Sequence, residues 1–520
     1  MAVWKRCRLE ILPFLSSFFL ILSFPPYNIE YLAWVSLLPL LFYCRKQVSP
    51  GKSFWGGFCT GLVFFLCIYA YIALSVNFVL PRYVGVLVVI ASAFYSALFY
   101  GVFSLLIFYF LRGTMTVLSV LSAPSVWVLL EYLRSLGLLG HTGGFLGFSQ
   151  SYHLLLQPIA FYGYWGLPFL IVLFQTILFF LCCNFNNRQQ KNRSFKKAVV
   201  LLFIFLVMLA GGICLPSFFP IQEKDKPLRI ALIQGNIPQE NILDPAMSVD
   251  NFRKYIELSE KAYRLYAPLD LLVWPETVFS ASLARQHPAV EKEITSLATK
   301  LKTSILYGAM CEEKPAGETF NSILLCESGR SSQKKQRSDK LRLVPFAEYF
   351  PFPEILNNIW KTNISLGTYT PGTNIRTFQL DGFKFGGIIC FESYFAHPAL
   401  QIPQMEGEHI FILSNDAWFL ESSGLEQHAR AAIVRALETG LGVTQVANTG
   451  YTVSYDYAGR EILKLPALSE GIGLLETKIP VRQTLYLLWG DYFLYFCLLV
   501  LFLQIVVKIK RFYPQVLKPQ

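Results

Sequence analysis

Three polar residues with complementary chemistry stand beside apolar runs in the second half of this sequence. Glu276 follows Trp274-Pro275, Cys390 ends an apolar run, and Lys340 stands just before another. A cysteine thiol, with an ordinary pKa of about 8.5, is a weak nucleophile until a base or a cation lowers that value. A carboxylate supplies the base and an amine supplies electrostatic stabilisation. The three side chains together predict nucleophilic catalysis by a cysteine.

Each of these residues alone has a plain structural explanation. A single cysteine after an apolar strand is usually a small core residue. A glutamate after Trp-Pro is most often a turn or cap residue, and a lysine among other basic residues is usually solvated. The prediction of catalysis therefore depends on the combination, and on a fold that brings the three together.

The region that carries these residues, 226–482, has the pattern of an α/β domain. Helical spacing of apolar residues predicts helices between Phe252 and Tyr266 and over Leu425–Glu438. Short apolar runs predict buried strands at Arg229–Gln234, Leu269–Trp274, Ser304–Met310, Ser322–Cys326, Phe385–Cys390 and His409–Ser414. Strands that alternate with helices favour a helix-covered sheet, in which reactive groups gather where strands end.

The chain has 11 cysteines and no CxxC pair, so the sequence predicts neither a zinc site nor a disulfide framework. Only Cys311, Cys326 and Cys390 fall in the polar domain, and at most two of them can pair with each other. At least one thiol therefore stays available for chemistry. We expect no metal and no organic cofactor.

The composition of the 520 residues is too apolar for an ordinary soluble protein, with 54% hydrophobic and 15% charged residues. The net charge of +11 would favour binding to nucleic acid, but the basic residues lie in short clusters beside apolar runs. Anionic lipid headgroups attract such clusters. We therefore interpret the basic residues as signals of membrane topology, and we expect no nucleic-acid partner.

About eight apolar stretches are candidates to cross a bilayer, which needs about 20 residues per helix. The first two are short. The eight stretches are Ile11–Phe24, Tyr31–Cys44, Trp55–Val76, Val84–Leu111, Met115–Leu138, Pro158–Cys183, Ala198–Phe219 and Tyr492–Val507. These stretches predict an N-terminal bundle over residues 1–225 with seven spans, a catalytic domain over 226–482, and a last helix with a tail over 483–520.

Lysine and arginine clusters give the expected orientation, because short cytoplasmic loops are enriched in them. With eight spans, every cluster falls on one side of the membrane: Lys5 to Arg8, Arg45 to Lys52, Arg112, Arg188 to Lys197, and Lys508 to Arg511. Both termini are then cytoplasmic and the polar domain is extracytoplasmic. A cleaved signal peptide is the alternative for the N-terminus, but Pro25 and Pro26 stand where a small-residue cleavage site would be expected.

One charged pair lies inside the predicted bundle. Glu131 and Arg134 are one helical turn apart in an apolar stretch, where unsatisfied charges are costly. We interpret them as a mutually paired structural couple. The glycine-rich segment His141–Gly147 that follows predicts a loop, for which we favour a structural role over contact with a lipid headgroup.

The order of these motifs is similar to that of the nitrilase superfamily, whose members use Glu, Lys and Cys for carbon–nitrogen chemistry. Within it, the chain resembles the apolipoprotein N-acyltransferase family over nearly its whole length, including the span count and the region from Glu131 to Gly147. The fuller matches are Gln234–Gln239, Leu343–Phe346, Asn415–Phe419, Gln427-His428 and Ala447–Gly450. The resemblance implies a multi-span α-helical membrane bundle of about eight helices plus an α/β nitrilase-like αββα sandwich.

Four positions depart from the family pattern. Phe391 stands where the family usually has tyrosine, Leu243 where it commonly has tryptophan, Ala347 where it has glycine, and Leu420 where glycine is frequent. These changes affect fine substrate contacts and leave Glu276, Lys340 and Cys390 in place.

The resemblance implies a transfer of an acyl chain from a phospholipid, most often phosphatidylethanolamine in this family, through a thioester to the N-terminal amine of a diacylated apolipoprotein. Glu276 would be the base, Cys390 the nucleophile, and Lys340 with the backbone N–H of Phe391 the oxyanion donors. Glu348 and Glu392 would position Lys340 and shape the pocket, and Trp418 would line it. A structural role for Glu348, Glu392 or Trp418 is the alternative. The resemblance implies a monomer in the bacterial inner membrane.

Two other functions remain open at the level of sequence. In a membrane-anchored amidase or nitrilase, water instead of an amine would resolve the acyl-enzyme. The other function is a transporter or receptor with an outward ligand-binding domain, against which the spans carry few buried charges and no evident inverted repeat. It would also have no need of the Glu-Lys-Cys set.

Overall fold

The computed structural model describes residues 9–78, 80–184, 191–224, 226–279, 289–313, 317–329, 336–349 and 369–516. They form two compact units. The first comprises residues up to 73, 86–218 and 484 onward, and the second comprises 74–85 and 219–483. The basic residues Lys5, Arg6, Arg8 and Arg188 lie outside the described residues.

Apolar helices make up the first unit. Six helical segments in the described part of the chain are long and apolar enough to cross a membrane. They are Pro50–Ile68 (α4), Arg82–Phe110 (α6), Val117–Ser135 (α7), Gly166–Asn184 (α10), Ser194–Phe218 (within α11, Lys191–Cys214, and η4, Leu215–Phe218), and Tyr492–Lys510 (in α20, Tyr492–Val516). These correspond to six of the eight expected spans, and the chain is a membrane-embedded protein.

The two shortest expected spans form shorter helices. The first is α2, Leu12–Ser23, and the second divides into a 3-10 turn at Glu30–Trp34 (η1) and α3, Leu38–Lys46. The other short helices of the unit are η2, Leu146–Ser149; α8, His153–Leu156; α9, Pro158–Tyr162; and α19, Leu485–Trp489. Helix α5, Ala70–Val76, begins in the first unit and ends in the second.

The two charged residues of α7 hold the glycine-rich loop. Arg134 donates to the hydroxyl of Tyr69 and to the carbonyl of Gly143, both at 2.9 Å. Glu131 accepts from the backbone N–H of Leu146 at 2.7 Å. Within the described part of the bundle the two side chains bond to the loop and not to each other, so the expected mutual pair is wrong. Their role in organising the loop is structural, as expected.

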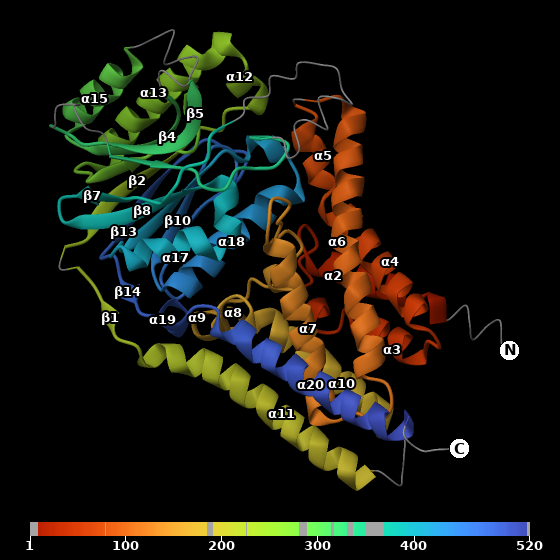
Figure 1. Ribbon diagram of the computed structural model, residues 1–520. Coiled ribbons are helices and arrows are strands. Elements are labelled where there is room, and N and C mark those ends of the chain that lie inside the picture. Colours follow the sequence, from red (N-terminus) through yellow and green to blue (C-terminus); the bar gives the residue numbers. More distant parts are fainter. Residues whose placement is uncertain are drawn as a thin grey trace. The chain divides into compact units, whose positions relative to one another are not determined.

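Two six-stranded sheets form the second unit (Figure 1). The first has the order β13-β2-β3-β4-β5-β6 and the second β12-β11-β10-β9-β8-β7. The first sheet contains Leu228–Gln234 (β2), Leu271–Val273 (β3), Ser304–Glu313 (β4), Glu318–Cys326 (β5), Gln336–Asp339 (β6) and Gly471–Thr477 (β13). The second contains Thr377–Leu380 (β7), Phe383–Ile389 (β8), His409–Ser414 (β9), Gly442–Ala447 (β10), Thr452–Tyr455 (β11) and Glu461–Leu465 (β12).

Side chains alternate between three apolar layers, as the two-residue period of a strand requires. In β2, Ile230 and Leu232 face the second sheet, whereas Ala231 and Ile233 face two helices, Ser248–Tyr266 (α13) and Val290–Leu301 (α15). The outer face of the second sheet packs against Ala396–Gln404 (α17) and Ser423–Thr439 (α18). Figure 1 shows both pairs of helices beside their strands. The result is the expected αββα sandwich.

Short 3-10 turns and helices connect these layers: Gln239–Leu243 (α12), Pro245–Met247 (η5), Cys390–Tyr394 (η6) and Asp416–Phe419 (η7). The first and last strands of the unit, Ile221–Gln222 (β1) and Val481–Arg482 (β14), pair with each other in an antiparallel two-stranded ladder. The entry and exit of the chain through this unit therefore lie side by side.

Candidate active site

The strand β3 and the turn after it position Glu276. The indole of Trp274 is fully buried and donates to the hydroxyl of Ser259 on α13 at 2.9 Å, which anchors the end of the strand. The carbonyl of Pro275 accepts from the N–H of Gly308 on β4 at 3.1 Å. A Cβ at Gly308 would lie 2.6 Å from the Cα of Glu276, so only glycine allows this close approach. The backbone under Glu276 is therefore tightly fixed.

The carboxylate of Glu276 is buried and accepts hydrogen bonds at both oxygens. Oε1 accepts from the side-chain amide of Asn321 at 2.8 Å, and Oε2 accepts from the backbone N–H of Asn415 at 2.8 Å. The Lys340 amine lies 3.5 Å from Oε1. Two N–H donors and one ammonium group therefore face this carboxylate.

The Lys340 amine is buried between two carboxylates. It donates to Glu348 Oε1 at 2.7 Å and lies 3.5 Å from Glu276 Oε1. Burial alone would lower the pKa of Lys340, but the charges of Glu348 and Glu276 outweigh burial and hold it above its ordinary range. Lys340 is therefore a permanent cation in this site and cannot serve as a base.

Glu348 holds Lys340 in place. Its Oε2 accepts from the backbone N–H of Val344 at 2.7 Å, and its Oε1 also accepts from Asn321 at 3.1 Å. Both oxygens of Glu348 therefore accept hydrogen bonds: Oε1 from the Lys340 amine and Asn321, and Oε2 from Val344. Of the two carboxylates beside Lys340, Glu276 has the longer contact with the amine.

Cys390 follows the last residue of β8 and opens the 3-10 turn η6 with a left-handed backbone, φ +48°. The parallel pairing of Ile389 with Leu413 brings it beside Ser414, at the end of β9. Burial and the charge of Glu276 raise the pKa of the Cys390 thiol well above its ordinary value, while Lys340 and a hydrogen bond with Ser414 oppose this. The resting sulfur is a thiol, and it needs a base to become a nucleophile.

Glu392 connects the Cys390 turn to the loop after Lys340. This fully buried carboxylate accepts from the backbone N–H groups of Ile389 at 2.8 Å, Leu341 at 2.7 Å and Arg342 at 3.1 Å. Burial raises its pKa to about 7, although those bonds oppose the rise. The geometry gives Glu392 a positioning function between the nucleophile and the lysine.

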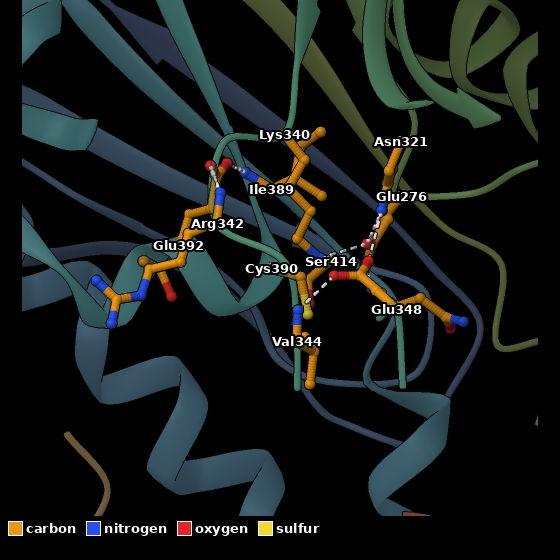
Figure 2. Close-up of polar contacts among 12 residues, drawn as sticks. Glu276, Asn321, Lys340, Arg342, Val344, Glu348, Ile389, Cys390, Glu392 and Ser414 are labelled. Atoms are coloured by element: carbon orange, nitrogen blue, oxygen red, sulfur yellow. Dashed lines mark hydrogen bonds and ion pairs between the residues drawn. The ribbon is translucent and has the colours of Figure 1, made fainter. Parts of the chain in front are cut away.

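Figure 2 shows the side chains of Glu276, Lys340 and Glu348 converging on the region of the Cys390 sulfur, with Glu392 on the other side of the cysteine turn. The fold therefore brings together all three residues that the sequence singled out for chemistry. The arrangement offers a nucleophile, a base and a fixed cation, which suits attack on a carbonyl carbon.

The two aromatic candidates, Phe391 and Trp418, each contact other aromatic rings. The Phe391 ring is half-buried and contacts the rings of Tyr394 and Phe395, with centroids at 6.0 and 5.2 Å. Trp418 in η7 is half-buried, contacts the ring of Phe78 at 5.9 Å, and accepts from the Ser75 hydroxyl at its carbonyl. Residues 74–85 and the Trp418 turn thus pack against each other within the second unit.

Sequence reasoning gave no role to several residues that the structure brings to the site. Asn321, in the middle of β5, bridges Glu276 and Glu348, and no local motif marks it. Asp416 and His428 belong to matched family motifs, and they form a buried pair behind Cys390. Leu243, a departure from the family, ends α12 and is 45% exposed.

Family models match both parts of the chain. Residues 16–177 match the apolipoprotein N-acyltransferase N-terminal domain, and residues 229–483 match the carbon–nitrogen hydrolase family. A protein from Geobacter metallireducens named apolipoprotein N-acyltransferase is 33% identical over 491 residues, which cover 93% of this chain and 92% of its own length. A protein of the same name from Photobacterium profundum is 28% identical over 484 residues, covering 91% and 90%.

Solved structures give a weaker likeness. Nit3 from Saccharomyces cerevisiae, a member of branch 10 of the nitrilase superfamily, matches 48% of this chain and 90% of its own at 17% identity and a TM-score of 0.38. The family assignment rests on the sequence matches alone.

Proposed function

The chain belongs to the apolipoprotein N-acyltransferase family, and we propose that this membrane-embedded acyltransferase works through a thioester on Cys390, with Glu276 as its base and Lys340 as its fixed cation. The observation that carries this proposal is the buried Lys340 amine, which is held by Glu348, lies 3.5 Å from Glu276 and points toward the Cys390 thiol.

In the first half-reaction, Glu276 takes the thiol proton and the Cys390 sulfur attacks an ester carbonyl of a phospholipid. A carbon–sulfur bond forms, and negative charge develops on the carbonyl oxygen. Lys340 and the backbone N–H of Phe391 stabilise that charge, an effect worth about 3 to 4 kcal/mol per donor in other enzymes. The ester carbon–oxygen bond then breaks, Glu276 returns the proton to the leaving oxygen, and lysophospholipid departs.

In the second half-reaction, the N-terminal amine of a diacylglyceryl-cysteine apolipoprotein attacks the thioester. A carbon–nitrogen bond forms, the carbon–sulfur bond breaks, and Glu276 passes the amine proton to the cysteine. The product is a triacylated lipoprotein. We expect phosphatidylethanolamine as the acyl donor, and an enzyme that acts as a monomer.

The family and the basic clusters support a location in the bacterial inner membrane, with both termini cytoplasmic and the catalytic domain periplasmic. Both proposed substrates are membrane lipids or lipid-modified proteins. A catalytic domain joined to spanning helices at both ends suits such substrates.

Intact mass spectrometry tests the proposal. The purified protein is incubated with phosphatidylethanolamine, with and without a diacylated lipopeptide, beside the Cys390→Ser variant. We expect a fatty-acyl adduct on Cys390 that disappears as the lipopeptide gains the same mass. Release of free fatty acid in place of acylated peptide would instead indicate a hydrolase. Turnover without an adduct, or an adduct on another residue, would contradict the thioester mechanism.

A further inference from the structure

A second buried network lies behind Cys390, and the mechanism above does not use it. His428 on α18 is 1% exposed and Asp416 in η7 is fully buried. The His428 Nε2 lies 3.0 Å from the carbonyl oxygen of Cys390, and its Nδ1 lies 2.8 Å from Asp416 Oδ1. The Ser414 hydroxyl donates to the same carboxylate oxygen at 2.6 Å.

The partners of His428 fix its charge. A carbonyl oxygen and a carboxylate oxygen can only accept hydrogen bonds, so these two contacts call for a hydrogen on each ring nitrogen. The hydroxyls of Ser393, 3.1 Å from Nε2, and Ser414, 3.5 Å from Nδ1, also face the ring, and a hydroxyl can accept as well as donate. Burial alone would lower the pKa of His428, but Asp416 and the Cys390 carbonyl raise it overall. The contacts and this direction both favour the imidazolium form of His428. His409, by contrast, is a buried histidine whose pKa burial lowers to about 3.

This arrangement excludes His428 as the base for the thiol. The Cys390 sulfur, an Asp416 oxygen and a His428 nitrogen lie within 4.8 Å of one another, a spacing that resembles a Cys-His-Asp triad or a metal site. A base or a metal ligand needs a free nitrogen lone pair. In the imidazolium form both ring nitrogens of His428 donate, to Cys390 and Asp416, so neither lone pair is available.

The contact acts on a peptide group that matters for the reaction. The Cys390 carbonyl and the Phe391 N–H belong to one planar trans peptide, in which C=O and N–H point in opposite directions. A bond that fixes the carbonyl therefore also fixes the direction of the N–H. The left-handed backbone of Cys390 costs about 1 to 2 kcal/mol in a non-glycine residue, so this peptide needs such external support.

We propose that His428, clamped by Asp416, is a positioning residue that aims the oxyanion-stabilising N–H of Phe391 by holding the Cys390 carbonyl. A charge-assisted bond to the carbonyl also polarises the peptide group, which makes its N–H a stronger donor. The inference rests on the proposed function, because it concerns the oxyanion of the acylation step.

Two polar variants of His428 test the proposal. In His428→Gln, the amide nitrogen takes the place of Nε2 and still donates to the Cys390 carbonyl. In His428→Asn, the shorter amide takes the place of Nδ1, so it keeps the Asp416 contact and loses the carbonyl. We expect Cys390 acylation by phosphatidylethanolamine to be about 10- to 100-fold slower in the Asn variant, with the Gln variant between it and wild type.

A second reaction of the same thiol separates positioning from other roles. Alkylation of Cys390 by iodoacetamide forms no oxyanion, so its rate should stay within about threefold of wild type in both variants, whereas acylation slows. His409→Gln is the matched control. It removes an equally buried histidine that bonds to Thr444, and it should leave the acylation rate unchanged.

Three results would overturn the inference. Equal acylation by the Gln and Asn variants would show that the carbonyl contact does not matter. Equal losses in the acylation and alkylation rates would show that His428 acts on the reactivity of the Cys390 thiol and not on the oxyanion donor. Acylation at the wild-type rate in Asp416→Asn would show that Asp416 is not needed to hold His428 in place. Asp416→Asn is also the variant to measure if His428→Asn does not fold. Failure of the proposed function differs from all three, because the wild-type protein would then form no acyl adduct.

Discussion

Replacement of Glu348 by glutamine tests most directly whether the buried cation is held for catalysis. The Glu348 carboxylate contacts the Lys340 amine at 2.7 Å, and both side chains are almost completely buried. Glutamine keeps the shape and one acceptor oxygen but removes the charge. Lys340 is then left with Glu276 alone, at present 3.5 Å away, and we expect the amine to move toward it.

The magnitude follows from the burial of the pair. Removal of one partner from a buried ion pair costs about 3 to 5 kcal/mol. Because glutamine still accepts a hydrogen bond, the cost should be nearer the value of a hydrogen bond to a charged group, about 1.5 to 3 kcal/mol. If that loss falls on the acylation transition state, the rate decreases about 10- to 150-fold.

Single-turnover acylation of Cys390, measured with a fluorescent phospholipid, gives the rate constant. The control is Glu408→Gln, which breaks the Lys224–Glu408 pair at 3.0 Å with both side chains 30% exposed, and it should change neither rate nor stability by more than about 1 kcal/mol. Acylation at the wild-type rate in Glu348→Gln, with an unchanged melting temperature, would refute the reasoning that Glu348 holds the catalytic cation.

Three further predictions concern the residues around this pair. The charged form of Glu392 accepts three backbone bonds and is populated above its pKa of about 7, so the acylation rate should rise as pH increases through about 7; a pH–rate profile of Glu392→Gln should lack this step. Gly308→Ala places a methyl group 2.6 Å from the Glu276 Cα, so acylation should fall at least about tenfold in the same single-turnover assay. The control Gly51→Ala, in the first turn of α4 with open space at its Cβ, should not slow it. Gly450→Ala places a methyl group 2.0 Å from Asp416 Oδ2, and thermal unfolding should show a loss of about 1 to 3 kcal/mol.

Strands built on an unbroken apolar run were predictable, whereas a strand with polar residues in the middle of its run was not. The runs that became β2, β4, β8 and β9 are apolar and fully paired, and all were expected. The central strand β10 was missed because Thr444 and Gln445 interrupt its apolar pattern. The structure satisfies Thr444 through His409 and Ser454, a tertiary arrangement that local sequence does not reveal.

The same limit applies to the site. Glu276, Lys340 and Cys390 were identifiable because each stands at a strand end and their chemistry is complementary. Asn321 was not, because it is one polar residue inside a strand and its role appears only when β5 and β6 pair in register. His428 lies in a helix, 38 residues from the carbonyl that it contacts, so its role depends on the packing of α18 against the cysteine turn.

The pairing of β1 with β14 has a consequence for the history of this chain. Domains whose two ends lie together can be inserted into a host protein with little disturbance at the junctions. Along the chain, β1 follows α11 and β14 precedes α20, with about 260 residues of the sandwich between the two strands. This geometry is compatible with a single insertion of an existing hydrolase-like sandwich into a helical membrane protein, with Ile221 and Arg482 near the seam.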